Sequence, residues 1–466
     1  MNQSWRPSLA PTSSPRYLAI ADALARDVRE GALQRGDQLP THRDLARTLG
    51  LTVGTVSRAY QEAARRGLVS GEVGRGTFVA APAPARSSAS EIRGLAEARH
   101  ELTINLPPDP ADDSLAAIFA DSLRALADSP QARTLLDYSP AGGTSAQRQA
   151  ALGWLAALGL APGRRRVLLA SGAQHAITLV LTALTRPGDL VVCEQLTYPG
   201  FKAAASSAGV TLEGVAVDEQ GVVPEDLERA CRAGAPKLCY LVPTIQNPTC
   251  SVLSPKRRDA VAEVLRRHRV PLLEDDIHGR LPTVSPQPIA ARIPELAFYV
   301  ASLSKALAPG LRTAYLVAPE AWAERLEAVL WANLWSTPPL TGELAARWMQ
   351  DGTGERILAA RRRETEVRQE IAREILAPHP FSAHPQGYQL WLPVPEPWRA
   401  EDFVAAARQR GVGINAPSTF FVGRGATPHA VRVCLGAPTG QAALREALGV
   451  VRELLDAPAS APLNVA

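Results

Sequence analysis

Hydrophobic residues follow two different patterns along the chain, one before about residue 80 and one after about residue 103. Near the N-terminus, Tyr17 to Glu30 and His42 to Leu49 each place their apolar residues on one helical face. A third helix begins after Thr52, a suitable N-cap, and Leu68 to Val79 alternates around glycines as a hairpin does. Three short helices and a hairpin predict a winged helix-turn-helix.

After residue 103, short apolar strands alternate with helical stretches, which predicts an α/β domain with a mostly parallel sheet. The segment between the two patterns is rich in Ala, Pro and Ser and has no period, as in a linker. We therefore divide the chain into a DNA-binding domain at 1–80, a linker at 81–102 and a large domain at 103–466. The strands expected in the large domain are 190–193, 238–242, 271–273, 298–301 and 315–317, with a helix at 255–269.

Composition narrows the function classes. The chain has 466 residues, 46% hydrophobic and 21% charged, which suits a folded protein of two or three domains. Its apolar runs are too short to span a bilayer, so we expect no membrane partner and a cytoplasmic location. Five scattered cysteines and eight scattered histidines favour neither disulfides nor a metal site. We predict no metal.

The positive charge is concentrated near the N-terminus. Residues 1–80 contain 11 Arg and 7 acidic residues, 11 − 7 = +4, which equals the net charge of the whole chain. The predicted third helix leaves polar side chains on its outer face, where they would reach bases and phosphates. The alternative to DNA binding is that these helices form an interaction module whose charged face is simply exposed to solvent. The candidate DNA contacts are Arg43, Thr52, Thr55, Ser57 and Arg58, with Arg75 between two glycines at the hairpin tip. The run Arg361 to Arg363 instead suggests a solvated helix face.

Lysine is rare in this chain. Of 50 basic residues only four are Lys, at positions 202, 237, 256 and 305. A lysine amine can lose its proton and form a Schiff base, which a guanidinium cannot do. Lys305 lies in a polar turn that follows a predicted strand, and Asp275 ends another. Ligands bind at the carboxyl ends of such strands. Lys305 and Asp275 are therefore the candidate catalytic residues.

Three motifs near the N-terminus resemble the GntR-type winged helix. They are Leu39-Pro-Thr-His-Arg-Asp-Leu-Ala, Val53-Gly-Thr-Val-Ser-Arg-Ala-Tyr60 and Gly74-Arg-Gly-Thr-Phe-Val79. The resemblance covers residues 15–80 and implies a double-stranded operator as partner, bound by a dimer on a two-fold site.

The large domain resembles the fold-type I aminotransferases, which bind pyridoxal 5′-phosphate (PLP). The motifs that carry the resemblance include Ser171-Gly-Ala-Gln174, Gln246-Asn-Pro-Thr249 and Ser302-Leu-Ser-Lys305. It implies a smaller α+β subdomain at the C-terminus, Lys305 as the residue that carries the cofactor, and Arg432 with Tyr138 as substrate-binding residues. His278 stands where the family often has Tyr. The implied cofactor-binding residues are Gly172, Ala173, Gln174, Tyr198, Asn247, Asp275, His278, Ser302, Ser304, Lys305 and Arg312.

A winged helix fused to such a domain resembles the MocR branch of the GntR regulators. It implies a dimeric transcription regulator in which an amino acid or amine effector forms an aldimine with PLP. That exchange would change how the two winged helices meet DNA. The alternative is an active aminotransferase with an attached DNA-binding module. A decarboxylase or lyase on the same fold is a third interpretation.

Overall fold

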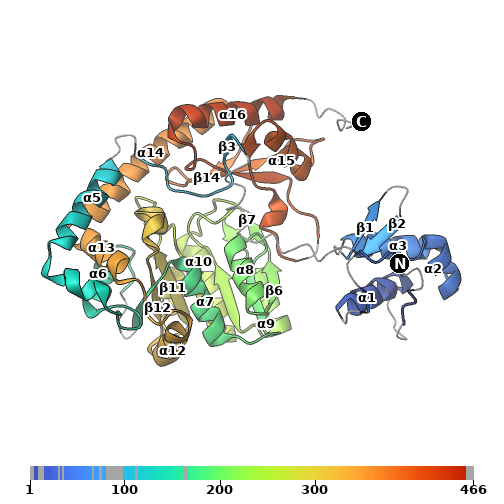
Figure 1. Ribbon diagram of the computed structural model, residues 1–466, viewed down its shortest axis with the longest axis horizontal. Helices are drawn as coiled ribbons and strands as arrows, with labels where there is room; N and C mark the ends of the chain where they lie inside the picture. The colour runs from blue at the N-terminus through green and yellow to red at the C-terminus, as the bar shows by residue number, and fades with distance from the viewer. Residues whose placement is uncertain are drawn as a thin grey trace. The chain divides into compact units, whose positions relative to one another are not determined.

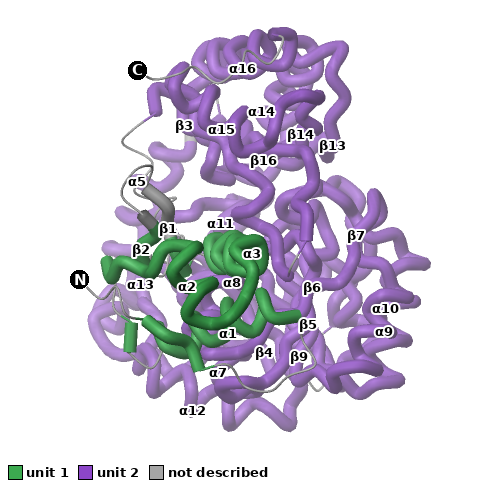
Figure 2. The backbone as a smooth tube through the Cα atoms, turned by 90° about the vertical axis from the view of Figure 1, so that its right-hand side faces the viewer, with its two compact units in different colours: residues 1–87 green, residues 88–466 purple. Residues whose placement is uncertain are grey.

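The computed structural model describes residues 5–8, 15–29, 32–33, 36–65, 68–72, 76–79, 98–110, 114–161, 163, 166–423 and 425–457. They belong to two compact units, residues 1–87 and 88–466, coloured separately in Figure 2. Among the described residues, no helix combines the length and the apolar character needed to cross a membrane.

The first unit is a winged helix-turn-helix. Its elements are α1 (Arg16–Arg29), α2 (His42–Leu49), α3 (Val53–Arg65) and the antiparallel pair β1 (Val69–Glu72) and β2 (Gly76–Val79). Gly50 ends α2 with φ 64°, a left-handed conformation that glycine adopts without strain and that turns the chain toward α3. Ile20, Leu24, Leu45 and Val56 form its core. Arg75, the predicted contact at the hairpin tip, lies outside the described residues.

The second unit contains a seven-stranded sheet, part of which is labelled in Figure 1. Its strand order is β4-β12-β11-β10-β9-β5-β6. Strands β6, β5, β9, β10 and β11 run parallel, and β12 is antiparallel to both of its neighbours. The sheet is thus mixed, with a parallel majority as predicted. The strands are β4 (Arg166–Ala170), β5 (Leu190–Glu194), β6 (Thr211–Val215), β9 (Leu238–Leu241), β10 (Leu272–Asp275), β11 (Ala297–Ser302) and β12 (Ala314–Ala318).

Helices cover both faces of this sheet and bury two apolar clusters. One cluster contains α7 (Ala173–Leu184), α8 (Pro199–Ser207) and α12 (Ala323–Leu334). The other contains α6 (Ser145–Ala156), α9 (Pro224–Gly234), α10 (Pro255–His268) and α13 (Pro339–Gln350). Since alternate residues of a strand point to opposite faces, Val191 and Val192 of β5 belong to different clusters.

A smaller α+β subdomain follows the sheet, as the sequence implied. Strands β13 (Ser382–Ala383), β14 (Gln389–Pro393) and β16 (Ala430–Cys434) form an antiparallel sheet. It packs with α14 (Thr353–Leu376), α15 (Ala400–Gln409) and α16 (Gly440–Asp456). Strand β3 (His100–Glu101), inside the segment that the sequence assigned to the linker, pairs with β15 (Val412–Gly413). Helix α5 (Ser114–Ala127) and the short helices α11 (Leu303–Ala306) and η2 (Pro130–Leu136) lie in the connections.

The expectation of a solvated face at Arg361 to Arg363 is wrong for the first of these residues. Arg361 is 1% exposed and donates hydrogen bonds to the backbone carbonyls of Leu307 and Pro108. Seven residues later, Arg368 donates to the carbonyls of Leu435 and Pro438. Buried backbone carbonyls require hydrogen-bond donors, and the two guanidinium groups provide them. These hydrogen bonds connect α14 to the loops around it.

Three consecutive acids, Glu274, Asp275 and Asp276, are buried at the end of β10. The Arg258 guanidinium lies 3.5 Å from the Glu274 carboxylate, which also accepts the amides of Ile289 and Ala290. Asp276 accepts a hydrogen bond from the Tyr299 hydroxyl. A buried anion is tolerated only with such compensation.

Replacing Arg258 by Met should therefore lower the free energy of unfolding by about 3–5 kcal/mol, because a buried carboxylate loses its cation. Urea denaturation followed by tryptophan fluorescence would measure the change. The control is Arg266→Met in the same helix, where the ion pair is half-exposed and the expected change is below about 1 kcal/mol. Equal effects of the two substitutions would contradict this role of Arg258.

Candidate functional site

The site lies where β9, β10 and β11 end. Asp275 is the last residue of β10, Ser302 is the last of β11, and Lys305 follows in α11. Because these strands are parallel, their carboxyl ends meet at one edge of the sheet. The structure thus brings together the two residues predicted as catalytic.

Asp275 is 1% exposed and is only partly satisfied by the protein. Its Oδ2 accepts a hydrogen bond of 2.7 Å from the Tyr240 hydroxyl, while Oδ1 has no hydrogen-bond partner among the described residues. Burial raises the pKa of this carboxyl to about 6. The free oxygen suits a ligand that brings a proton or a positive charge.

Lys305 forms hydrogen bonds through both its side-chain amine and its backbone carbonyl. Its Nζ donates to the backbone carbonyl of Asn105, and its own carbonyl accepts a hydrogen bond of 2.7 Å from the Tyr388 hydroxyl. Burial lowers the pKa of the amine to about 8. At pH 7 about a tenth of the amine is then unprotonated and nucleophilic, far more than for an exposed lysine.

The start of α7 forms a cradle for an anion. Gly172 caps the helix with φ 88°, and a Cβ on it would lie 2.5 Å from Nη2 of Arg312, so only glycine lets this guanidinium approach the helix. Ser171 directly precedes this cap, and its side-chain oxygen is buried without a hydrogen-bond partner in the described part of the chain, as is that of Ser304 next to Lys305. A helix N-terminus with an arginine and a free hydroxyl is a typical phosphate site.

Arg432 lies on β16 and is 3% exposed. Its guanidinium donates to Oδ1 of Asn247 at 2.8 Å, to Oδ1 of Asn415 at 2.7 Å and to the carbonyl of Thr103. These acceptors are neutral, and no carboxylate forms an ion pair with Arg432 in the described ranges. Its charge therefore remains available to an anion from outside the protein.

His278, three residues after Asp275, is also buried. Burial lowers the pKa of its ring to about 3, so the ring is neutral at physiological pH. Its Nε2 lies 3.5 Å from Nδ2 of Asn105, and Nδ1 lacks a hydrogen-bond partner among the described residues. The ring can offer one N–H donor inside the site.

One predicted residue, Tyr138, differs from the buried group around Lys305 because it is exposed. Tyr138 is 81% exposed, and its ring centroid lies 6.0 Å from that of Trp335. The ring of Tyr198 packs over Gly200, where an added Cβ would lie 2.3 Å from the tyrosine Cζ. Of the other predicted residues, the Gln174 amide donates to the Gly200 carbonyl at 2.7 Å. Ala173 is the first residue of α7.

Sequence reasoning missed three polar residues of the site. Tyr240 bonds Asp275, and the Asn105 amide donates to Oε1 of Gln389 at 2.7 Å. Gln389 in turn donates to the Gln246 carbonyl at 2.9 Å. A tyrosine in an apolar strand and a lone buried glutamine were the available signals, but their partners are distant in sequence.

The winged helix presents a second candidate site on α2 and α3. Arg43 and Arg58 are exposed, and the Thr52 hydroxyl accepts the Thr55 amide at 3.2 Å. Ser57 is half-buried and shares a hydrogen bond of 2.9 Å with Nδ1 of His42. The described predicted contacts thus lie on one helix and at the start of the helix before it.

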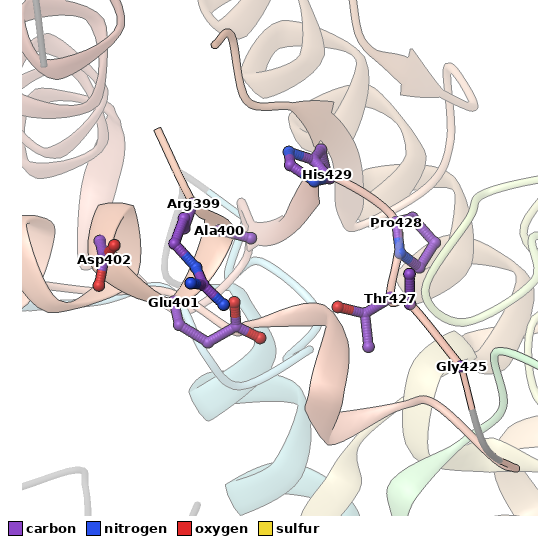
Figure 3. A pocket seen from close by; sticks show the side chains of 9 residues that line it. Arg399, Ala400, Glu401, Asp402, Gly425, Thr427, Pro428 and His429 are labelled. Atoms are coloured by element: carbon purple, nitrogen blue, oxygen red, sulfur yellow. The ribbon is translucent and has the colours of Figure 1, made fainter. Parts of the chain in front are cut away.

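Figure 3 shows a hollow elsewhere in the large unit, of about 460 Å³, at the start of α15. Arg399 and Glu401 line one side, and Thr427 and His429 line the other. Its charged side chains are exposed. This hollow is separate from the site, because it contains none of the residues around Lys305. Among the described residues, no group of three or more His, Cys, Asp or Glu could hold a metal ion.

Comparison with known proteins identifies the family. The model of bacterial regulatory proteins of the gntR family matches residues 16–79, and that of class I and II aminotransferases matches residues 101–451. The HTH-type transcriptional regulator YdeF of Bacillus subtilis is 31% identical over 454 residues, 97% of each chain. This protein belongs to the MocR-type regulators of the GntR family.

Two further comparisons concern the whole chain and the fold of its large unit. The vitamin B6 salvage pathway transcriptional repressor PtsJ of Salmonella typhimurium is 28% identical over 408 residues, 86% of this chain and 91% of PtsJ. A crystal structure of Pyrococcus horikoshii kynurenine aminotransferase has a TM-score of 0.72 at 21% identity, over 79% of this chain and 94% of that one. The structural likeness establishes the fold of the large unit.

The buried Asp275 should make the ligand-free protein less stable at high pH. Its pKa is raised from 3.8 to about 6, so its stability penalty is absent below pH 4 and complete above pH 6, at up to about 3 kcal/mol. Asp275→Asn should therefore stabilise the ligand-free protein at pH 8 and have little effect at pH 4. The exposed Asp128→Asn is the control. An Asp275→Asn effect that does not change with pH in urea titrations would contradict this origin.

Proposed function

We propose that this regulator holds PLP at Lys305 and uses it to sense an amine or amino acid that alters operator binding. The single observation that carries the proposal is the unsatisfied polar surface around Lys305. Asp275 Oδ1 and the hydroxyls of Ser171 and Ser304 are buried without hydrogen-bond partners in the described chain. Buried polar groups without partners are rare and point to a missing ligand.

The residues present fit PLP in charge as well as position. Arg312 and the first amides of α7 would bind the phosphate, and Asp275 would accept the proton of the pyridine nitrogen. That pairing also removes the penalty of burying the carboxylate. His278 and Asn247 would lie beside the 3′ oxygen. When bound, PLP supplies an aldehyde that condenses reversibly with primary amines.

Arg432 supports an effector that carries a carboxylate. Its guanidinium is fixed by two asparagine oxygens and keeps an uncompensated charge. A carboxylate that contacts it would place the α-amine of the same molecule toward Lys305. The effector can change DNA binding only by binding more tightly to one conformation of the protein than to the other.

The relatives favour regulation over transamination as the main function. YdeF is matched over 97% of its length, including both the DNA-binding and the aminotransferase-like parts.

A purified sample of the protein incubated with amino acids should therefore change its absorbance without releasing 2-oxo acid. Gel shifts on the region upstream of its gene should then respond to the same amino acid. Release of 2-oxo acid at many turnovers would support the enzyme alternative.

Lys305→Ala should abolish covalent attachment of PLP. After borohydride reduction, mass spectrometry of peptides should find the label at Lys305 in the unchanged protein and in the exposed-lysine control Lys256→Ala. Because the amine pKa is about 8, attachment of added PLP should accelerate as pH rises through 8 and then level off. A label that persists in Lys305→Ala would show that another lysine is used.

We also propose that the protein is a homodimer through an aromatic face of the large unit. Trp331 and Trp335 are each 52% exposed, their rings are 4.7 Å apart, and Tyr138 packs beside them. Leu136 and Leu340 are also exposed. An exposed group of large apolar side chains is typical of an interface. A partner on this face would bury Tyr138, the predicted substrate-binding residue.

Replacing both Trp331 and Trp335 by Glu should therefore yield a monomer, because charges cannot be buried across an apolar interface without partners. Light scattering after size exclusion would measure the mass. Val284→Glu, which changes another exposed apolar residue, should leave the mass unchanged. A wild-type protein that is monomeric at micromolar concentration would refute the interface.

A further inference from the structure

The start of α3 presents an apolar surface that the fold itself does not require. Val53, the first residue of the helix, is 45% exposed. Gly54 follows it and is also exposed, and a Cβ there would meet only Oγ1 of Thr52, at 4.0 Å. Its φ is not in the left-handed region. Since glycine is a poorer helix former than alanine, neither steric space nor backbone conformation explains it.

The neighbouring hydroxyls are already engaged. Oγ1 of Thr52 and Oγ1 of Thr55 are 2.9 Å apart, and the Thr55 amide donates to Thr52. The two threonines therefore cap the helix and hold each other in place. The isopropyl group of Val53 remains as the projecting side chain without polar atoms on this turn.

The unit that carries this apolar surface is basic, since its first 80 residues carry a net charge of +4. The exposed Arg43 is the second residue of α2, and the exposed Arg58 lies on α3 itself, five residues after Val53. An exposed apolar side chain at the start of the second helix of a basic helix-turn-helix fits the major groove of DNA, where the first residues of that helix meet the base edges.

We propose that Val53 contacts the C5 methyl group of a thymine in each half-site, and that Gly54 lets the DNA approach the helix closely. The thymine methyl is the apolar group that the major groove displays. Cytosine has no such methyl and presents an amino group, which Val53 would leave without a partner. Val53 and Gly54 therefore select thymine at one position. This inference rests on the proposed DNA-binding function.

The test begins with DNA selected by the full-length protein from a randomised double-stranded library. Each thymine of the selected site is then replaced in turn by deoxyuridine, which removes only the methyl group. In each half-site, one thymine should be sensitive, and its single replacement should weaken binding about fourfold, the loss expected for one methyl contact. All other thymines should tolerate the change.

Val53→Ala links the effect to the residue. This variant should bind the thymine site more weakly than the unchanged protein does, and deoxyuridine should cause it no further loss, because the two changes remove the same contact. Val284→Ala is the matched control, since this valine is exposed on the large unit. It should bind both DNAs like the unchanged protein.

Gly54→Ala tests the close approach separately. The variant should melt at the same or a higher temperature than the unchanged protein, yet bind the selected DNA at least fivefold more weakly. Gly449→Ala, in α16, is its control, because a Cβ there also meets nothing within 4 Å. It should not change DNA affinity.

The outcomes separate this inference from the proposed function. If the library yields no preferred sequence, DNA recognition itself fails. If DNA is selected but deoxyuridine has no effect at any position, or lowers the affinity of Val53→Ala as much as that of the unchanged protein, the contact of Val53 with thymine is refuted. Unchanged affinity of Gly54→Ala refutes the close approach.

Discussion

The candidate site of the large unit depends on a carboxylate buried at the end of a strand. Asp275 has Tyr240 on one oxygen and no hydrogen-bond partner on the other in the described chain. Its neighbours in sequence are acids as well, and the Arg258 guanidinium forms an ion pair with one of them, Glu274. The protein thus accepts a local loss of stability at a position where a ligand with a positive charge would restore it.

Arginine performs several different tasks in this molecule because its five donors can satisfy different acceptors. Arg361 and Arg368 saturate backbone carbonyls and join segments that are distant in sequence. Arg432 is held by amide oxygens, which fix its position without neutralising it. Lys305 differs from all of these, since burial lowers the pKa of its amine, whereas a guanidinium remains charged.

In both units, a local feature that the fold itself does not need matches the chemistry of a binding partner. Around Lys305, polar atoms without partners suit a polar ligand. At the start of α3, an exposed valine and an exposed glycine suit an apolar group at close range. In each case a local feature that does not stabilise the isolated fold indicates where another molecule binds.

The amino-acid sequence alone predicted the winged helix and five of the seven strands of the large sheet, and it singled out Lys305 and Asp275, which lie at one edge of that sheet. These features depend on local periodicity, capping residues and motifs of a few residues, so they can be recognised without distant contacts. The sequence did not predict strands β4 and β6, Tyr240 as the partner of Asp275, or the burial of Arg361. These depend on which residues meet after folding. A hydrogen bond between positions 240 and 275, or between 361 and 108, joins segments whose approach is set by the packing of the whole sheet and not by any local pattern.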